Sequence, residues 1–317
     1  MKKEFEFLDN IKSMYRLSKI GDDCAVLPKD DETDLVLTVD MLVEDIDFRL
    51  EWATPEDLGH KVFAVSLSDV AAMGAFPKWA MLSIAIAEDL WKTDFLNRFY
   101  DGWHQLAREY SVELVGGDIS RTPGKLVIDS IVGGEVPKGR AILRSGAKPG
   151  DAIFVSGSLG GAAGGLILLE SGKDTGIHSK SALNLIEHQL RPIPEVVLAN
   201  SLQTQQLAAS LIDTSDGLSS DLGHICRASG VGARIHADLL PVDPSLGADF
   251  PPETALEMAL HGGEDLRLIF TGDKKKIVAA RIDNISHIGE ITANSGLIEV
   301  TRDGKTTVLD QKGYQHF

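Results

Sequence analysis

The sequence predicts a mixed α/β (α+β) fold in two domains, and three observations support this prediction. The chain has 317 residues, and a domain usually holds roughly 100–200 residues, so two separate cores are expected. Short apolar runs rich in β-branched residues alternate with longer segments of helical periodicity. Proline and glycine cluster at residues 137–150 between two such series, as they do in linkers. We therefore predict domains at residues 1–138 and 139–317.

In the first half, the expected order is strand, helix, strand, helix, strand, strand. Residues 35–39 form an apolar strand that ends at Asp40. A long helix is expected over residues 55–73, because Thr54 can cap it and Pro55 suits its first position. The remaining elements are a strand at 78–87, an amphipathic helix at 94–110, and strands at 112–115 and 125–136.

The second half begins again with a strand at residues 152–156, followed by a glycine-rich turn and a helix. Helices are then expected at 181–190, 194–203 and 219–228, and strands at 211–212, 233–237 and 266–270. A proline-rich loop is expected at residues 241–252. The two halves have a similar order of elements but no residue-level repeat.

Charge argues against a nucleic-acid partner. Lys and Arg number 31 against 47 Asp and Glu, which gives a net charge of −16. Such a surface repels a phosphate backbone, and no basic run with interleaved aromatic residues occurs.

Neither a secretory nor a membrane location is expected. No apolar segment follows Lys2 and Lys3, as a signal peptide would require. The longest apolar-leaning stretch, residues 152–169, is broken by serine and glycine, so no bilayer span is expected. The two cysteines, Cys24 and Cys226, cannot form a disulfide framework. We therefore expect a cytoplasmic protein.

Acidic residues stand beside apolar runs at several separate places. The set comprises Asp22, Asp23, Asp40, Asp69, Asp118, Asp213, Asp216, Glu264 and Asp265. Each alone is typical of a turn or a helix cap. If they converge, two carboxylates ~4 Å apart repel by about 4 kcal/mol at an effective dielectric constant of 20. Such a cluster needs cations, and its hard oxygen ligands favour Mg²⁺ or Ca²⁺. Because cations reverse the local field, metal-dependent phosphoryl transfer from ATP is the resulting hypothesis.

The common nucleotide-binding motifs do not match. The segment that ends in Gly304, Lys305 and Thr306 has Glu299 where a Walker A loop needs glycine. The turn at residues 157–164 has Leu159 where a dinucleotide-binding turn needs glycine. This turn is typical either of close helix–sheet packing or of phosphate contact through backbone N–H groups. The sequence lacks the H-R-D and D-F-G motifs of protein kinases and the G-x-S-x-G motif of hydrolases.

Eight motifs in one order resemble those of the thiamine-monophosphate kinases, of the superfamily that includes aminoimidazole ribonucleotide synthetase. They are GDDCAV at 21–26, TVD at 38–40, LSDVAAMG at 67–74, GGD at 116–118, residues 139–151, DTSDGL at 213–218 with GGED at 262–265, and KGY at 312–314. The resemblance covers almost the whole chain. It implies an aminoimidazole ribonucleotide synthetase-like fold that dimerises through the N-terminal domains, whose strands form a shared barrel. It also implies transfer of the γ-phosphate of ATP to thiamine monophosphate.

The resemblance further implies a role for particular residues. Several Mg²⁺ ions would be held by Asp23, Thr38, Val39 through its backbone, Asp40, Asp69, Asp118, Asp213 and Asp216. ATP would contact Gly117, Asp118, Arg144 and Ser215. Asp40, Asp118 and Arg144 would position the reactants and neutralise charge, without a covalent nucleophile. Thiamine monophosphate would contact Glu264 and Tyr314, the latter by stacking on a thiamine ring.

The sequence departs from the family pattern at two positions near the acceptor. Asp47 stands where the family usually has histidine, and Leu266 stands where it usually has tyrosine. A carboxylate at position 47 could pair with the cationic thiazolium ring, so Asp47 is a candidate substrate contact. The acceptor phosphate is already anionic near pH 7, so alignment and charge neutralisation suffice for the transfer.

Alternatives remain within and outside the superfamily. Selenophosphate synthetases carry a reactive cysteine or selenocysteine near the start, and residues 1–20 contain no cysteine. The hydrogenase-maturation dehydratase ends in a cysteine-bearing tail, which this sequence lacks. An aminoimidazole ribonucleotide synthetase-like enzyme remains open, as does a non-catalytic nucleotide-binding protein.

Overall fold

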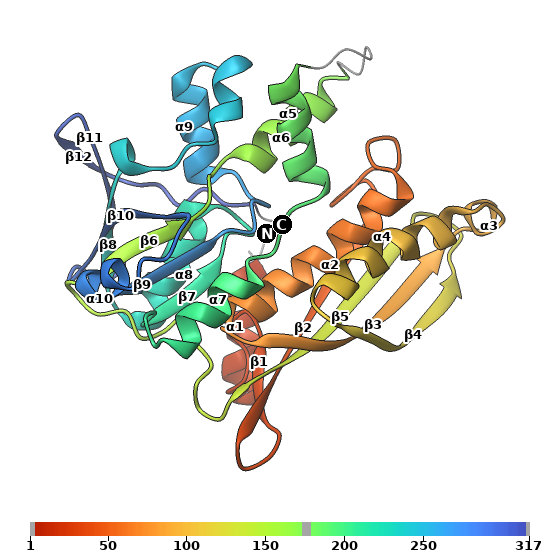
Figure 1. Ribbon diagram of the computed structural model, residues 1–317, viewed down its shortest axis with the longest axis horizontal. Helices are drawn as coiled ribbons and strands as arrows, with labels where there is room; N and C mark the ends of the chain where they lie inside the picture. Colours follow the sequence, from red (N-terminus) through yellow and green to blue (C-terminus); the bar gives the residue numbers. More distant parts are fainter. Residues whose placement is uncertain (1–3, 173–178, 315–317) are drawn as a thin grey trace.

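Two mixed β-sheets organise the protein (Figure 1). The computed structural model describes residues 4–172 and 179–314. The first sheet has the order β1-β2-β5-β3-β4. Its strands are β1 (Ala25–Pro28), β2 (Thr33–Val43), β3 (Phe76–Ile86), β4 (Glu113–Arg121) and β5 (Val127–Pro137).

The second sheet has the order β12-β11-β8-β10-β6-β9-β7. Its strands are β6 (Ala152–Ser156), β7 (Ser210–Asp213), β8 (Gly232–His236), β9 (Leu268–Gly272), β10 (Ile285–Thr292), β11 (Ile298–Arg302) and β12 (Lys305–Val308). The first sheet ends at Pro137 and the second begins at Ala152, so the proline- and glycine-rich segment lies between them.

Helices flank both sheets. They are α1 (Glu4–Tyr15), α2 (Pro55–Ala72), α3 (Glu88–Trp91), α4 (Phe95–Glu109), α5 (Gly161–Glu170), α6 (Lys180–Leu190), α7 (Val196–Thr204), α8 (Leu218–Ser229), α9 (Pro252–His261) and α10 (Lys274–Ala279), with 3₁₀ turns η1 (Ala237–Leu239) and η2 (Pro244–Ala248). Of the helices in the described residues, none is long and apolar enough to cross a membrane.

Helix α2 is the central element of the molecule. It begins as predicted, because Thr54 and Asp57 form a reciprocal capping box and Pro55 occupies the first turn. With α4 it covers one face of the first sheet (Figure 1). A Cβ atom on Gly102 would lie 1.9 Å from the carbonyl oxygen of Glu56, so glycine is required where α4 crosses α2. Helix α2 also contacts α6, α7 and β7 of the second half, so it touches both sheets.

Two predicted strands are longer than expected, which changes the place of two aspartates. The strand predicted to end before Asp40 continues to Val43, and the one predicted at 112–115 continues to Arg121. Asp40 therefore lies inside β2, where its carboxylate accepts a hydrogen bond from Ser66 of α2. Asp118 lies inside β4, an edge strand whose residues are all exposed, so the polar side chain is tolerated there.

Several elements were not predicted, including α1, β1, α9, α10 and the strands β10–β12. The loop predicted at 241–252 contains η2, and α9 begins at its end. Strands β11 and β12 are a short polar hairpin around Gly304, which has a φ of 73°. Strand β11 alternates apolar and polar residues over only 298–301, and β12 has a single apolar residue and is exposed throughout, so the hairpin gives a weak strand signal.

Candidate active site

Acidic residues from both halves of the chain meet beside α2. The carboxylate oxygens of Asp23, Asp69 and Asp213 lie within 4.8 Å of one another. Asp23 precedes β1, Asp69 lies on α2, and Asp213 ends β7. Asp40 lies close enough to Asp69 for its charge to contribute to the raised pKa of Asp69. We call these four residues (Asp23, Asp40, Asp69 and Asp213) the acidic cluster; all four belong to the larger acidic set predicted from the sequence.

Hydroxyl groups hold three of these carboxylates in place. Thr38 Oγ1 donates to Asp69 Oδ2 at 2.5 Å, and Ser66 Oγ donates to Asp40 Oδ2 at 2.7 Å. Ser68 Oγ donates to Asp213 Oδ2 at 2.5 Å. In the described part of the chain, Asp23 Oδ2 and Asp213 Oδ1 are buried and have no hydrogen-bond partner. Buried carboxylate oxygens without a donor are costly, and a cation supplies what they lack.

The raised pKa values of the cluster also indicate an excess of buried negative charge. Burial raises the pKa of Asp69 well above its usual 3.8, and the charges of Asp40, Asp213 and Asp23 raise it further. Burial also raises the pKa of Asp213 to about 7 and that of Asp40 to about 6. The ionised cluster is therefore unfavourable without a counter-charge. Its all-oxygen donor set fits the hard ions Mg²⁺ and Ca²⁺.

Arg144 forms an ion pair with this cluster. Its Nη2 donates to Asp23 Oδ1 at 2.7 Å, and its backbone N–H donates to Asp22 Oδ1 at 2.8 Å. The side chain is 20% exposed, so it can still reach a ligand. Burial raises the pKa of Asp23 although Arg144 lowers it, so one guanidinium does not balance the cluster.

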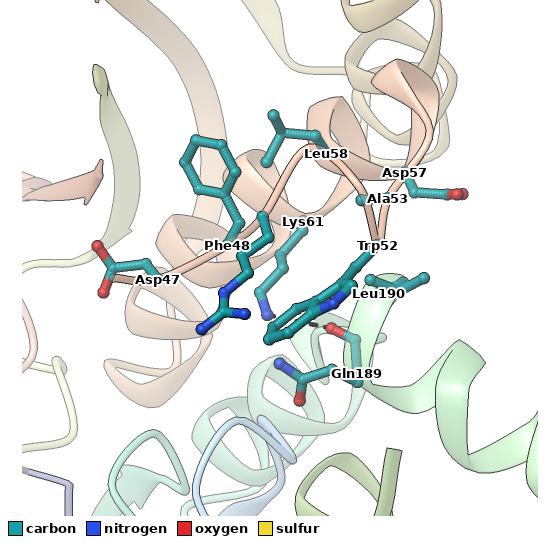
Figure 2. A pocket seen from close by; sticks show the side chains of 10 residues that line it. Asp47, Phe48, Trp52, Ala53, Asp57, Leu58, Lys61, Gln189 and Leu190 are labelled. Atoms are coloured by element: carbon teal, nitrogen blue, oxygen red, sulfur yellow. Dashed lines mark hydrogen bonds between the residues drawn. The ribbon is translucent and has the colours of Figure 1, made fainter. Parts of the chain in front are cut away.

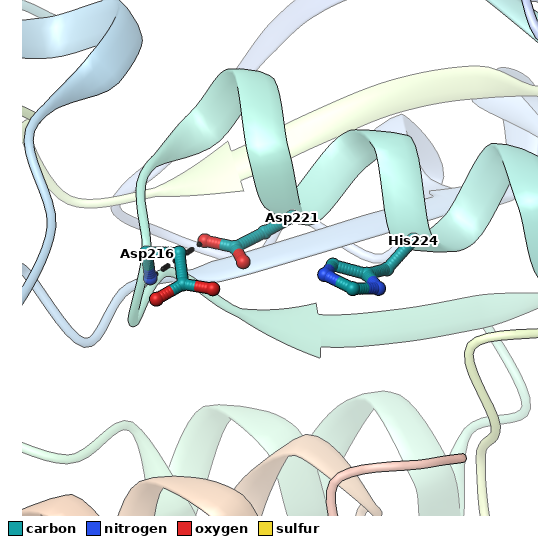
Figure 3. A group of neighbouring side chains, drawn as sticks. All are labelled: Asp216, Asp221 and His224. Carbon is teal, nitrogen blue, oxygen red and sulfur yellow. Dashed lines mark hydrogen bonds between the residues drawn. The ribbon is translucent and has the colours of Figure 1, made fainter. Parts of the chain in front are cut away.

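A second group of potential metal ligands lies in the loop after β7 and at the start of α8. Ligand atoms of Asp216, Asp221 and His224 lie within 4.8 Å of one another (Figure 3). Asp221 Oδ2 accepts the backbone N–H groups of Asp216 at 3.2 Å and Gly217 at 2.9 Å, which fixes the start of α8. Burial lowers the pKa of His224 to about 3, so this imidazole is neutral. Asp216 was predicted as a metal ligand from the sequence, whereas Asp221 and His224 were not, although their spacing puts both on one face of a helix.

The predicted nucleotide contacts Gly117 and Asp118 lie apart from the acidic cluster. Asp118 pairs with Ser83 in the register of β3 and β4, and its side chain is exposed. A hollow beside it is lined by Leu82, Tyr100 and residues 114–119. Tyr100, which was not predicted as a site residue, is half-buried there. The predicted metal contact Val39 has a 60% exposed side chain on β2, and Ser215 is exposed in the loop after β7.

The two acidic residues of the Gly-Gly-Glu-Asp motif make different contacts. Asp265 is buried and accepts the backbone N–H groups of Gly160 at 2.5 Å and Ala162 at 2.9 Å. It therefore occupies the N-terminus of α5, which supports the packing interpretation of the glycine-rich turn over phosphate contact. Glu264 points elsewhere, toward Lys61 Nζ, at 3.0 Å from Oε1 and 3.1 Å from Oε2.

A pocket next to Lys61 is lined by the predicted acceptor contact Asp47 (Figure 2). Asp47 Oδ2 accepts the backbone N–H of Val43 at 2.8 Å, which closes the turn after β2. The other lining residues are Phe48, Arg49, Trp52, Ala53, Asp57, Leu58, Gln189 and Leu190. The predicted stacking residue Tyr314 is 51% exposed and lies beside Asp216, whose carbonyl oxygen accepts its backbone N–H at 3.4 Å.

Family models match most of the chain. The model "AIR synthase related protein, N-terminal domain" matches residues 21–136, and "AIR synthase related protein, C-terminal domain" matches residues 148–301.

Relatives with a common printed name match nearly the full length. The chain is 41% identical over 307 residues to "Thiamine-monophosphate kinase" of Escherichia coli (strain K12), covering 94% of this chain and 91% of the relative. It is 36% identical to the protein of that name from Bacillus subtilis (strain 168), covering 94% and 93%. A solved structure described as "AaThiL complexed with AMPPCP and TMP" superposes with a TM-score of 0.88 at 35% identity, covering 99% of this chain and 97% of that one.

Proposed function

The chain belongs to the AIR synthase related family and, within it, to the thiamine-monophosphate kinases, and from this premise we propose its reaction. It is an ATP-dependent kinase that phosphorylates thiamine monophosphate to thiamine diphosphate. A relative of known structure binds TMP together with AMPPCP, a non-hydrolysable analogue of ATP, which supports both substrates.

The observation that carries the chemistry is the acidic cluster with its two unpaired buried oxygens. Mg²⁺ ions would be held mainly by Asp23, Thr38, Asp40, Asp69 and Asp213. The backbone of Val39 and the side chains of Asp118 and Asp216 would contribute at the edges of the site. Bound Mg²⁺ supplies charge neutralisation for a triphosphate. Without such ions, the four ionised carboxylates would repel the nucleotide rather than bind it.

The nucleotide would contact Gly117, Asp118, Arg144 and Ser215. In the single chain, Gly117 and Asp118 lie on the edge strand β4, apart from Arg144 and the acidic cluster. Arg144 is only partly exposed and already oriented by Asp23, so its guanidinium can contact a phosphate group with little loss of conformational freedom. Asp40, Asp118 and Arg144 position the reactants and neutralise charge.

The acceptor would be held by Asp47, Glu264 and Tyr314. Carboxylates at 47 and 264 can pair with the cationic thiazolium ring, and Tyr314 can stack on an aromatic ring. An oxygen of the acceptor phosphate attacks the γ-phosphorus in line, the bond from that phosphorus to the β–γ bridging oxygen breaks, and ADP leaves. Because the attacking oxygen is already anionic, no general base is needed.

Residues 1–138 would form the domain that binds ATP and Mg²⁺, and residues 139–317 would complete the site. The face of the first sheet opposite α2 exposes apolar side chains, including Val39 and Met41 at 60% each. Two copies would pair through these faces into a dimeric barrel, since apolar faces of this kind mark interfaces. Two buried free cysteines, Cys24 and Cys226, support a cytoplasmic location.

An assay of product formation tests this function. Purified protein with ATP, Mg²⁺ and thiamine monophosphate should form ADP and thiamine diphosphate in equal amounts. Asp69→Asn should abolish both products, while Asp101→Asn on the exposed face of α4 should leave them unchanged. ADP formation that does not depend on thiamine monophosphate would favour another reaction of the superfamily. Nucleotide binding without any product would favour a non-catalytic protein.

A further inference from the structure

A buried lysine joins α2 to the acceptor side of the site. Lys61 has a side chain only 4% exposed, and its ammonium group lies 3.0 Å from Glu264 Oε1 and 3.1 Å from Glu264 Oε2. It also donates to the backbone carbonyl of Gln189 at 3.1 Å (Figure 2). The side chain amide of Gln189 donates to the same Glu264 carboxylate. Two donors from two helices, α2 and α6, therefore converge on one glutamate.

Glu264 is held in an unusual backbone conformation. Its φ is 66°, in the left-handed region that residues with a side chain rarely adopt. Its backbone N–H donates to the carbonyl oxygen of Ser215 at 2.9 Å, so the loop that carries Glu264 is tied to the predicted nucleotide loop. Strained residues of this kind persist only where their surroundings fix them.

The junction between α2 and the end of α6 has other polar contacts besides those of Lys61. That junction already has an ion pair between Arg191 and Asp57 at 3.1 Å, and His60 Nε2 lies 2.8 Å from the carbonyl oxygen of Pro192. Lys61 and Ser68 lie seven residues apart on one face of α2. Ser68 reaches the metal side of the site through Asp213, and Lys61 reaches the acceptor side through Glu264.

We propose that Lys61 is a positioning residue for thiamine monophosphate, which acts by holding the Glu264 carboxylate in the geometry that receives the acceptor. This inference rests on the proposed function. The Glu264 side chain is 34% exposed and can meet a ligand, whereas Lys61 is buried and acts through it. Gln189 assists as the second donor. The ion pair between Lys61 and Glu264 therefore links recognition of the acceptor to the contact between α2 and the second half of the chain.

Steady-state kinetics with matched variants test this role. Lys61→Met should raise the KM for thiamine monophosphate about tenfold or more, as expected for loss of a charge-assisted contact. Its kcat and the KM for ATP should stay within about twofold of wild type, because the metal side of the site is intact. Gln189→Met should change the same KM in the same direction. Arg191→Met is the matched control, since it breaks another ion pair to α2 without touching Glu264.

A double-mutant cycle separates action through Glu264 from direct contact with the substrate. If Lys61 acts through Glu264, the variant Lys61→Met with Glu264→Gln should have the same KM as Glu264→Gln alone. Additive effects would overturn the proposal, as would equal changes in both KM values or in kcat. An active wild type whose KM is unchanged by Lys61→Met and Gln189→Met would overturn it while leaving the function intact. A wild type without thiamine monophosphate-dependent product would instead overturn the proposed function.

Discussion

Ser68 of α2 donates a hydrogen bond to Asp213 at the end of β7, at 2.5 Å across the junction of the two halves. Asp213 Oδ1, the other oxygen of this carboxylate, is buried without a partner in the described residues. The serine therefore fixes the carboxylate and leaves one oxygen directed for another ligand. Asp69, one residue after Ser68, provides the next carboxylate from the same helix turn. The hydrogen bond that joins the two halves of the chain therefore also orients a carboxylate of the expected metal site.

Neutralising a cluster aspartate should stabilise the metal-free protein while abolishing activity. In Asp69→Asn, the burial of a charge and the repulsion that together raise the pKa of Asp69 are removed, so Tm in EDTA should rise by several degrees. In saturating Mg²⁺, the wild type should gain more Tm than the variant, because ligand binding stabilises the folded state. Thermal unfolding of both proteins with and without Mg²⁺ checks this. A lower Tm for Asp69→Asn in EDTA would contradict the expected repulsion.

The stability difference between wild type and Asp213→Asn should depend on pH in a defined direction. The folded pKa of Asp213, about 7, lies above its usual value of 3.8, so the folded state binds this proton more tightly. The resulting stabilisation of the wild type is complete below pH 3.8 and is lost as pH rises through about 7. In EDTA, the Tm advantage of Asp213→Asn should therefore grow between pH 5 and pH 8. Comparing the two proteins cancels the contribution of the histidines, and a constant difference would oppose this assignment.

Apparent affinity for Mg²⁺ should improve as pH rises over the same range. Protons compete with the metal for Asp40 and Asp213, whose pKa values are about 6 and about 7. Isothermal titration from pH 6 to pH 8 should show a lower Kd for Mg²⁺ at the higher pH. An affinity independent of pH would mean that these two carboxylates do not bind the ion.

Shortening the predicted stacking residue should affect one substrate. Tyr314→Ala should raise the KM for thiamine monophosphate about tenfold and leave the KM for ATP nearly unchanged, since a stacked aromatic pair and its buried area are lost. Tyr314→Phe is the control, because it keeps the ring. Equal effects on both KM values would remove the assigned role.

A charge on the open face of the first sheet should separate the proposed dimer. Met41→Arg places a cation among exposed apolar side chains of β2, so light scattering should show a monomer. Val278→Arg is the matched control, because Val278 is 61% exposed on α10, in the second half of the chain. A wild type that is monomeric at micromolar concentration would argue against pairing through this face.

Local signals explain which parts of the fold the sequence could predict. Helix α2 was predicted because Thr54, Pro55 and Asp57 all mark its start within four residues. Asp40 was placed at a strand end because a carboxylate usually stops an apolar strand, and the sequence does not show that the distant Ser66 donates a hydrogen bond to it inside β2. The apolar alternation of β11 spans only four residues and β12 has none, so these strands, which pair with each other and with β8, were not predicted.

The site residues that lie within recognisable sequence motifs could be predicted from the sequence. Convergence of Asp23, Asp40, Asp69 and Asp213 followed from their positions at apolar runs and from the family resemblance. Lys61 was not predictable, because its partner Glu264 lies 203 residues away and no local pattern joins them. Asp118 was predicted to join the other aspartates, and in the single chain it lies on the exposed edge strand β4.

We propose that the carboxylates at the junction of the two halves bind divalent cations that accompany ATP. Anomalous diffraction from crystals grown with Mn²⁺ and a non-hydrolysable ATP analogue tests whether cations bind there. We predict anomalous peaks within coordination distance of Asp69 and Asp213, which disappear in crystals of Asp69→Asn. An ordered nucleotide with no anomalous peak at these carboxylates would contradict the claim.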